Sequence, residues 1–352
     1  MGHATVENLT PFAFEALYLT DEELHPLLVP VVKATYELGR SGLRLAEEQE
    51  PLHHGGIFHG TKEGSSYRYE PEVAFFKPAT DVVLVGHAYA PSADTRELKV
   101  ELQVGPLRKV VQVLGERVWF KSLGHVSMTR PQPFERMPLC YERAFGGGDR
   151  SHPDASRHTF EPRNPVGVGF RAHPSHFEEG LRLPNLEDPE APLRRFGQVV
   201  VPTGFGFVSP QWHPRARLAG TYDEQWAKGR APLLPRDFDR RFFNAASPGL
   251  VANGYLRGNE SVTLVNALPE GRLDFRLPGT PPPRVRVVRA SDEDVWLELR
   301  LDTLILDTDA RRVFFLWRAH LPLWEGPHEV RSLHLRAERV EQRPQVVRGR
   351  GA

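Results

Sequence analysis

The sequence predicts a mainly-β protein with a few short helices, in which two antiparallel, sandwich-like β units are joined by a central region rich in proline and glycine. Proline accounts for 32 of the 352 residues, roughly 9% against a usual ~5%, and there are 30 glycines, a composition that disfavours long helices. Runs with a period of two recur towards both ends of the chain. Aromatic residues are spread along most of the sequence, which argues against disorder.

The N-terminal β unit is expected over residues 1–127. Residues 27–38 are rich in valine and alternate in part, and residues 81–89 form a continuous apolar run. Residues 98–104, LKVELQV, alternate strictly between apolar and polar side chains, as a half-buried strand does. The sequence GPLRK and a further apolar run follow, so we expect two or three antiparallel strands in hairpin connection.

The central region is expected over residues 128–260, where prolines recur every few positions. Short helices are predicted at 223–228 and 239–246, the second of which has an aspartate cap and stops near Pro248. The remainder is predicted to be loop wrapped over the strand layers. Within it, the stretch LCYERAFGGGDR is interpreted as a strand end followed by a glycine turn, with Asn164 and Pro165 returning the chain.

The C-terminal β unit is expected over residues 261–352, where alternating runs return. The segment 295–306 alternates, and DTDARR at 307–312 has the chemistry of a turn, so a hairpin is predicted there. The last ten residues, 343–352, are expected to be frayed.

Charge and targeting signals exclude several classes of protein. Lys plus Arg and Asp plus Glu both number 45, so there is no electrostatic reason to expect binding to nucleic acid or to an anionic membrane. A single cysteine excludes an internal disulfide. The N-terminus does not look like a signal peptide, and no apolar run approaches the ~20 residues of a membrane helix. We expect a soluble, cytoplasmic protein.

The chemical motifs favour neither a cofactor, nor a metal, nor a catalytic site. GVGFRA at 167–172 mimics a dinucleotide fingerprint, but Pro174 would break the helix that should follow it. Cys140 is expected to be a small buried hydrophobe rather than a nucleophile. His173 and His176 lack the cysteine pair or the HExxH spacing of a zinc site. Nothing in the sequence places two carboxylates at the ~5–10 Å separation of a glycosidase; the candidates are Glu142, Glu187, Asp188, Asp223, Asp237 and Asp239.

A set of aromatic and arginine residues in the central region is the best candidate for a partner-binding surface, because these residue types dominate protein–protein hot spots. The segment 212–230 is the richest part. The alternative is that the aromatics fill the space between sheets and the arginines pair with local carboxylates. The candidates are Trp212, Arg215, Tyr222, Trp226, Arg230, Arg143 and Arg163.

Long ordered motifs add a resemblance to a known family. MPLCYERAFGG, NPVGVGF, PTGFGFVSPQWHPR, GTYDEQWAKGRAPLLPRDFDRRFFNAA and RRVFFLWRA occur in this order. They resemble a bacterial family encoded beside type VI secretion effectors, whose members act as effector adaptors or chaperones. The family motif Ala-Phe-Gly-Gly is matched by residues 144–147, whereas Gly148 and the residues after it look like a local insertion.

The resemblance implies binding of a cognate toxic effector, its stabilisation, and help in delivering it to the VgrG spike. It implies no cofactor and no catalytic residue. The alternative function is a hydrolase acting on carbohydrate or peptide, which would need convergent carboxylates or a Cys140–histidine pair in one deep pocket.

Overall fold

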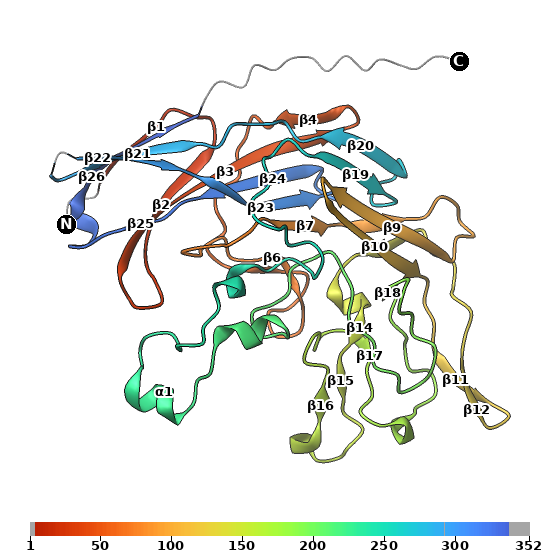
Figure 1. Cartoon of the computed structure of the whole chain (residues 1–352). Coiled ribbons are helices and arrows are strands. Elements are labelled where there is room, and N and C mark those ends of the chain that lie inside the picture. Colours follow the sequence, from red (N-terminus) through yellow and green to blue (C-terminus); the bar gives the residue numbers. More distant parts are fainter. Residues whose placement is uncertain (1–3, 292, 338–352) are drawn as a thin grey trace, which may run out of the picture.

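The computed structural model describes residues 4–291 and 293–337, and strands dominate it (Figure 1). The mainly-β prediction is confirmed. The described part of the chain contains one α-helix, α1 (Glu224–Gly229), and several one-turn 3₁₀ helices. The frayed end expected at 343–352 lies outside the described residues. The 3₁₀ helices are η1 (Tyr141–Arg143), η2 (Ala155–Arg157), η3 (Pro174–His176), η4 (Arg215–Ala219), η5 (Arg240–Phe243) and η6 (Pro327–Glu329).

The largest sheet has the order β2-β3-β24-β23-β7, with β4 and β25 also paired to β3. Its strands are β2 (Ala13–Thr20), β3 (Pro26–Gly39), β4 (Gly42–Leu45), β7 (Asp81–Val85), β23 (Arg300–Asp307), β24 (Arg312–Arg318) and β25 (Leu321–Pro322). The valine-rich β3 is buried along most of its length, which explains why its sequence alternates only in part. Lys33 lies inside this strand with no exposure and pairs with Glu72 at 2.8 Å.

Two further sheets flank this one. The five-stranded sheet has the order β18-β10-β9-β19-β20, and the four-stranded sheet has the order β1-β26-β21-β22. The first contains β9 (Glu97–Val104), β10 (Leu107–Leu114), β18 (Leu186–Glu187), β19 (Ser261–Val265) and β20 (Arg272–Arg276). The second contains β1 (Thr5–Asn8), β21 (Arg284–Arg289), β22 (Asp294–Glu298) and β26 (Val330–Arg336). β9 and β10 form the hairpin that the alternating run 98–104 predicts.

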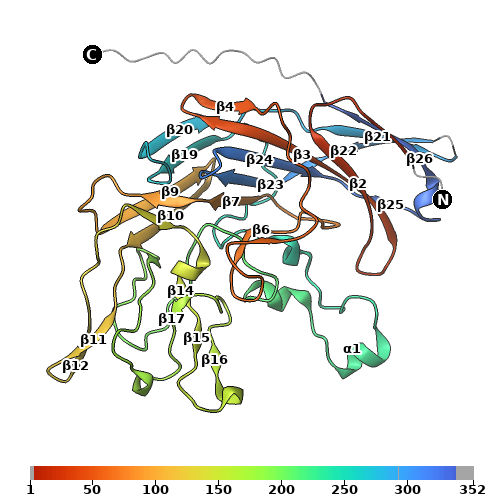
Figure 2. The same cartoon turned by 180° about the vertical axis from the view of Figure 1, so that it is seen from behind.

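Strands from the two ends of the chain share all three large sheets. β7 pairs in parallel with β23, β24 pairs with β3, and β9 pairs with β19. Figures 1 and 2 show the early and late strands side by side. The main core cluster accordingly includes Val100 and Leu102 together with Leu264 and Phe315. The boundaries near 127 and 261 are therefore changes in sequence composition and do not separate two independent sheets, because neighbouring strands from both ends bury one common core.

The central region hangs below the sheets in Figure 1 and contains short strand pairs as well as loop. A small core there joins Phe145 and Leu183 of this region to Trp119, which precedes it in the chain. The two-stranded pairs of the fold are β5 (Ile57–Phe58) with β6 (Tyr67–Tyr69), β8 (His87–Tyr89) with β13 (Arg136–Pro138), β11 (Trp119–Ser122) with β12 (His125–Met128), β14 (Phe145–Gly146) with β17 (Val168–Gly169), and β15 (Gly148–Asp149) with β16 (Thr159–Phe160).

Of the two predicted helices, one forms as an α-helix and the other as a single 3₁₀ turn. Asp223 caps α1 by accepting a hydrogen bond from the Trp226 N–H at 2.8 Å. Asp239 caps η5 in the same way, but this helix ends at Phe243. Asn244 is extended there, and its side chain donates to the Ala79 carbonyl and to Asp81, which draws the chain back onto the sheet.

Candidate functional site on a protruding arm

Residues 220–237, here called the arm, carry α1 and project away from the sheets in both views (Figures 1 and 2). Thr221 closes the base of the arm by donating its backbone N–H and its hydroxyl to Asp237, at 3.0 and 2.7 Å. Gly220 has a φ of 85°, and a Cβ there would meet Pro235 at 2.7 Å. Glycine is therefore required at the neck of the arm for both conformation and space.

The arm presents two aromatic side chains next to each other. The rings of Tyr222 and Trp226 are 4.7 Å apart, with an edge-to-face angle of 68°. Tyr222 is 53% exposed and Trp226 is half-buried. The Trp226 indole N–H donates to the Leu233 carbonyl at 2.8 Å, which ties α1 to the returning half of the arm. The pair is thus held in place while one ring faces solvent.

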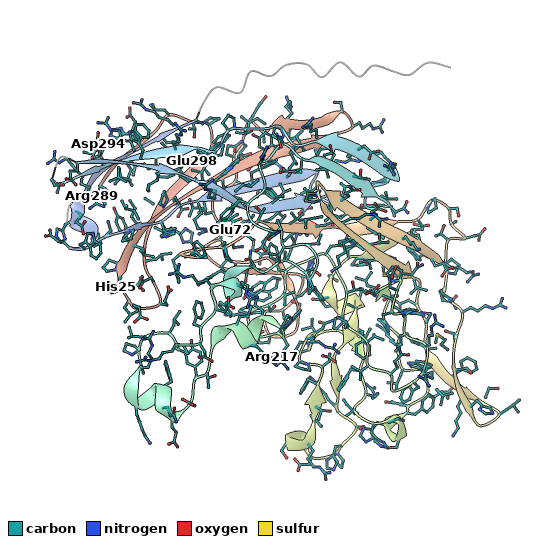
Figure 3. The ribbon with its side chains drawn as sticks, in the orientation of Figure 1. His25, Glu72, Arg217, Arg289, Asp294 and Glu298 are labelled. Carbon is teal, nitrogen blue, oxygen red and sulfur yellow. The ribbon has the colours of Figure 1, made fainter. Side chains whose placement is uncertain are left out.

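The arm is fastened to the turn between β2 and β3, where Figure 3 labels His25. Arg230 donates two hydrogen bonds to the Glu23 carboxylate, at 2.5 and 3.0 Å, and these hydrogen bonds lower the pKa of Glu23. The Leu234 N–H donates to the Glu22 carbonyl at 3.1 Å. These contacts orient the arm relative to the large sheet.

Trp212 and Arg215 lie at the root of the arm and are buried, so their prediction as surface residues is wrong. Trp212 is 6% exposed and packs edge-to-face on Tyr141 with ring centroids 5.6 Å apart. Arg215 is 7% exposed, donates to the carbonyls of Phe242 and Val208 at 2.7 and 2.8 Å, and pairs with Glu70. Burial with every contact made inside the chain gives both residues a structural role.

Arg143 and Arg163 belong to the glycine-rich loops and not to the arm. Arg143 pairs with Glu116 at 2.6 Å, and Arg163 pairs with Glu161 at 2.6 Å and also donates to the Val200 carbonyl. Both pair with a local carboxylate, as the alternative interpretation of the arginines expected. Of the seven predicted residues, the structure brings together on the arm only Tyr222, Trp226 and Arg230.

The motifs AFGG and NPVG pack directly against each other. Asn164 is completely buried, and its amide donates to the carbonyls of Tyr141 and Phe145 at 2.8 and 3.0 Å. Gly147 donates its N–H to the Asn164 carbonyl at 2.8 Å, and a Cβ on Gly146 would overlap that same oxygen. The glycines therefore permit a close approach of two backbones, and residues 141–143 form a 3₁₀ turn where a strand end was expected. Sequence reasoning did not assign Asn164 this central role.

The same glycines line a hollow of about 210 Å³, together with Trp119, Phe196, Arg171 and Arg182. The pattern GVGFRA continues from β17 into the single 3₁₀ turn η3 and not into an α-helix. A dinucleotide phosphate would therefore meet no helix N-terminus there.

The side chains considered for catalysis or metal binding lie in environments that differ from those these roles require. Burial, followed by the nearby Glu142 carboxylate, raises the pKa of the Cys140 thiol to about 12, the opposite of what activates a nucleophile. His176 bonds Asp149 at 2.6 Å. Within residues 4–291 and 293–337, no group of three or more His, Cys, Asp or Glu side chains could hold a metal ion.

The carboxylates considered for a glycosidase pair are engaged separately. Glu142 accepts hydrogen bonds from Ser66, and Glu187 forms a buried ion pair with Arg117 at 2.5 Å. Asp188 accepts a hydrogen bond from the Glu190 backbone N–H. The remaining three, Asp223, Asp237 and Asp239, cap α1, close the base of the arm and cap η5.

These features define a mainly-β protein whose central loops carry a braced aromatic arm. The sequence profile of a bacterial protein family, described as an uncharacterized protein conserved in bacteria (DUF2169), matches residues 23–318, and the chain belongs to this family. No curated protein and no solved structure matches the chain. Among the described residues, no helix combines the length and the apolar character needed to cross a membrane.

Proposed function

We propose that the protein is a non-catalytic adaptor or chaperone, acting in the cytoplasm, that binds a cognate type VI secretion effector, stabilises it and helps to load it onto the VgrG spike. The motif resemblance supplies the class of partner. The arm carries the structural part of the argument, because it presents the aromatic pair Tyr222 and Trp226 on a projection braced at its base and at Glu23.

A braced aromatic pair suits recognition of a protein surface. Aromatic rings supply large contact areas with few rotatable bonds, and a preorganised arm loses little further entropy when a partner binds. Neither Tyr222 nor Trp226 belongs to the hydrophobic core clusters, so their contribution to folding should be small. Loss of these rings should therefore separate binding from stability.

The experiment is a pull-down from cells that carry the neighbouring effector and VgrG genes, using the wild type and Tyr222→Ala combined with Trp226→Ala. The double variant should lose effector capture by a factor equivalent to ~2 kcal/mol or more, as hot-spot residues do. Its melting temperature should stay near that of the wild type.

Two further variants complete the design. Leu123→Ala removes a side chain that is 97% exposed in the turn between β11 and β12, outside the arm, and should capture the effector normally. Tyr222→Phe keeps the ring and should also capture it. Normal capture by the double variant would exclude the arm as the recognition surface, and failure of the wild type to capture any effector would exclude the proposed partner class.

A further inference from the structure

β22 is the outermost strand of the four-stranded sheet and has a free edge. Within residues 4–291 and 293–337, it pairs with β21 on one side and with no strand on the other. The Leu299 N–H donates to the Pro283 carbonyl, and the Arg289 N–H donates to the Glu293 carbonyl, just beyond the two ends of the paired segment. Because hydrogen-bonded pairs alternate along antiparallel strands, Val295 and Leu297 direct their backbone groups towards β21.

It follows that Asp294, Trp296 and Glu298 direct their N–H and C=O groups towards the free edge, and Figure 3 labels Asp294 and Glu298 on this strand. Among residues 4–291 and 293–337, no loop donates to these groups or accepts from them. The side chains of the same three residues are exposed. An edge of this kind can template a further strand.

A groove of about 360 Å³ runs beside this edge. Trp296, Leu297 and Glu298 form one wall, and the rings of Phe76 and Tyr255 lie among the residues of the other walls. A second hollow of about 400 Å³ is lined by Trp296 and Glu298 together with Arg284 and Arg336. Trp296, which is 52% exposed, thus belongs to both depressions. The edge has space beside it for an extended segment with side chains on both faces.

The charges around the edge favour an acidic partner. The side chains of Arg300 in the groove and of Arg284 and Arg336 in the second hollow form no hydrogen bond or ion pair within the described part of the chain. Arg284 and Arg336 face each other directly across β21 and β26, an unfavourable arrangement of like charges. Glu298 lies directly opposite Arg284 across β21 and β22, and among the described residues its carboxylate forms no hydrogen bond or ion pair, whereas Asp294 is paired with Arg286.

The other charged side chains that line the groove are paired, so they do not change the net charge around the edge. Lys77 pairs with Asp81 at 2.8 Å, and Arg318 pairs with Asp302 at 2.6 Å. Three unpaired arginines against one unpaired carboxylate leave the region with a net positive charge. The carboxylates of an incoming segment would form ion pairs with these arginines.

Two other occupants fit the charges less well. Residues 338–352 carry four arginines and two glutamates, so the chain's own tail has the same sign of charge as the region it would enter. A second copy that paired its own β22 antiparallel about Trp296 would place Asp294 opposite Glu298 on both sides. Like charges directly opposite each other disfavour that pairing.

We propose that the free edge of β22 accepts an extended segment of the partner protein as an added strand. Its acidic side chains lie on the face that carries Arg284 and Arg336, and its apolar side chains lie on the face of the groove lined by Phe76 and Tyr255, where Arg300 also lies. This inference rests on the proposed function for the identity of the partner. The edge geometry and the charge are independent of that identity, so they can be tested separately.

The test uses a short labelled peptide that alternates glutamate and valine, with a lysine–valine peptide as its charge-reversed control, measured by fluorescence anisotropy on the full chain. The acidic peptide should bind at least about tenfold more tightly than the basic one. Arg284→Glu combined with Arg336→Glu should abolish this preference. Equal binding of both peptides would overturn the charge argument.

Variants at Trp296 test whether the backbone groups of the free edge bind the peptide. Trp296→Pro removes an N–H that points away from β21, so the sheet should remain intact while peptide binding falls at least about tenfold. Trp296→Ala keeps the N–H and should weaken peptide binding less than Trp296→Pro does. Residue-resolved hydrogen exchange gives a second measurement in the unmutated protein: the acidic peptide should slow exchange at Asp294, Trp296 and Glu298, while Val295 and Leu297 are already slow. Protection that appears elsewhere would overturn strand addition at this edge.

Three controls identify the occupant. Concentration-dependent dimerisation that Trp296→Pro abolishes would replace the partner segment with a second copy. Tighter peptide binding after removal of residues 338–352 would assign the edge to the chain's own tail. Peptide binding without effector capture would contradict the proposed function but not strand addition at the edge. Normal effector capture by Trp296→Pro would contradict strand addition alone.

Discussion

Arg230 and Glu23, which are 207 positions apart in the chain, form a two-pronged ion pair that joins the arm to the turn between β2 and β3. Leu234 of the arm also donates its N–H to the Glu22 carbonyl in the same turn, and Arg240, just beyond the arm, donates to the Glu22 carboxylate. The orientation of the arm therefore depends on residues at the opposite end of the sequence.

Removal of this pair should loosen the arm without unfolding the protein. We expect Arg230→Ala to speed hydrogen exchange over residues 221–236 and to weaken partner capture. The melting temperature should change little, because a partly exposed ion pair on a protruding segment contributes little to global stability. Arg241→Ala is the matched control, because among the described residues the Arg241 side chain pairs only with the neighbouring Asp239. Unchanged exchange in the arm of Arg230→Ala would contradict the bracing role.

Asn164 should be among the most sensitive residues of the central region. Its amide donates hydrogen bonds to two buried carbonyls. Asn164→Ala should therefore lower the free energy of unfolding by about 2–4 kcal/mol in urea denaturation. Asn164→Asp has nearly the same size but lacks the donor group, and it should be at least as destabilising. Asn253→Ala, an exposed asparagine without a hydrogen bond, should cost little. A stable Asn164→Asp would show that packing and not hydrogen bonding holds the two motifs together.

Cys140 should be chemically inert in the native protein. Burial and the adjacent Glu142 raise the pKa of its thiol to about 12, so almost no thiolate is present at neutral pH. Iodoacetamide should label it slowly in buffer and rapidly in denaturant, with mass spectrometry as the readout. Cys140→Ser should cost ~1–2 kcal/mol of stability and leave effector binding intact. Fast labelling of the folded protein would argue against this view.

Asp149 should make the protein sensitive to acid. Burial alone would raise the pKa of this carboxyl, but hydrogen bonds from His176, Ser151 and the Ala172 N–H outweigh burial and hold the pKa well below its ordinary value of 3.8. A depressed folded-state pKa stabilises the native state above the unfolded pKa, and this contribution is lost as the pH falls through the folded pKa.

The matched variant is Asp149→Asn, compared with the wild type by urea unfolding. It should be less stable by about 1–3 kcal/mol near neutral pH, and the difference should shrink as the pH falls below about 4. Asp94→Asn, at an exposed carboxylate without hydrogen bonds, should show no such convergence. A constant difference at all pH values would assign the effect of Asp149→Asn to geometry and not to charge.

The sequence alone was sufficient for features that depend on neighbours a few residues apart. The alternation of LKVELQV predicts β9, whose side chains are alternately more and less buried along the strand. Asp223 predicts the start of α1, because a cap acts within one helical turn. Proline density predicts the lack of long helices. These interactions join residues close in sequence, so they do not depend on how the rest of the chain packs.

The tertiary structure alone decided which distant segments meet. Lys33 occupies what the sequence pattern would make a polar position of a strand, yet it is buried. The Pro51 carbonyl, from the segment before β5, and Glu72, from the segment after β6, satisfy its ammonium group. β7 lies beside β23 although more than two hundred residues separate them. Among the predicted site residues, Arg215 is buried and Tyr222 is exposed. The two lie close together in the sequence, and both are residue types common in protein-binding hot spots. Burial is set by what the whole chain packs against, and one segment's composition does not contain that information.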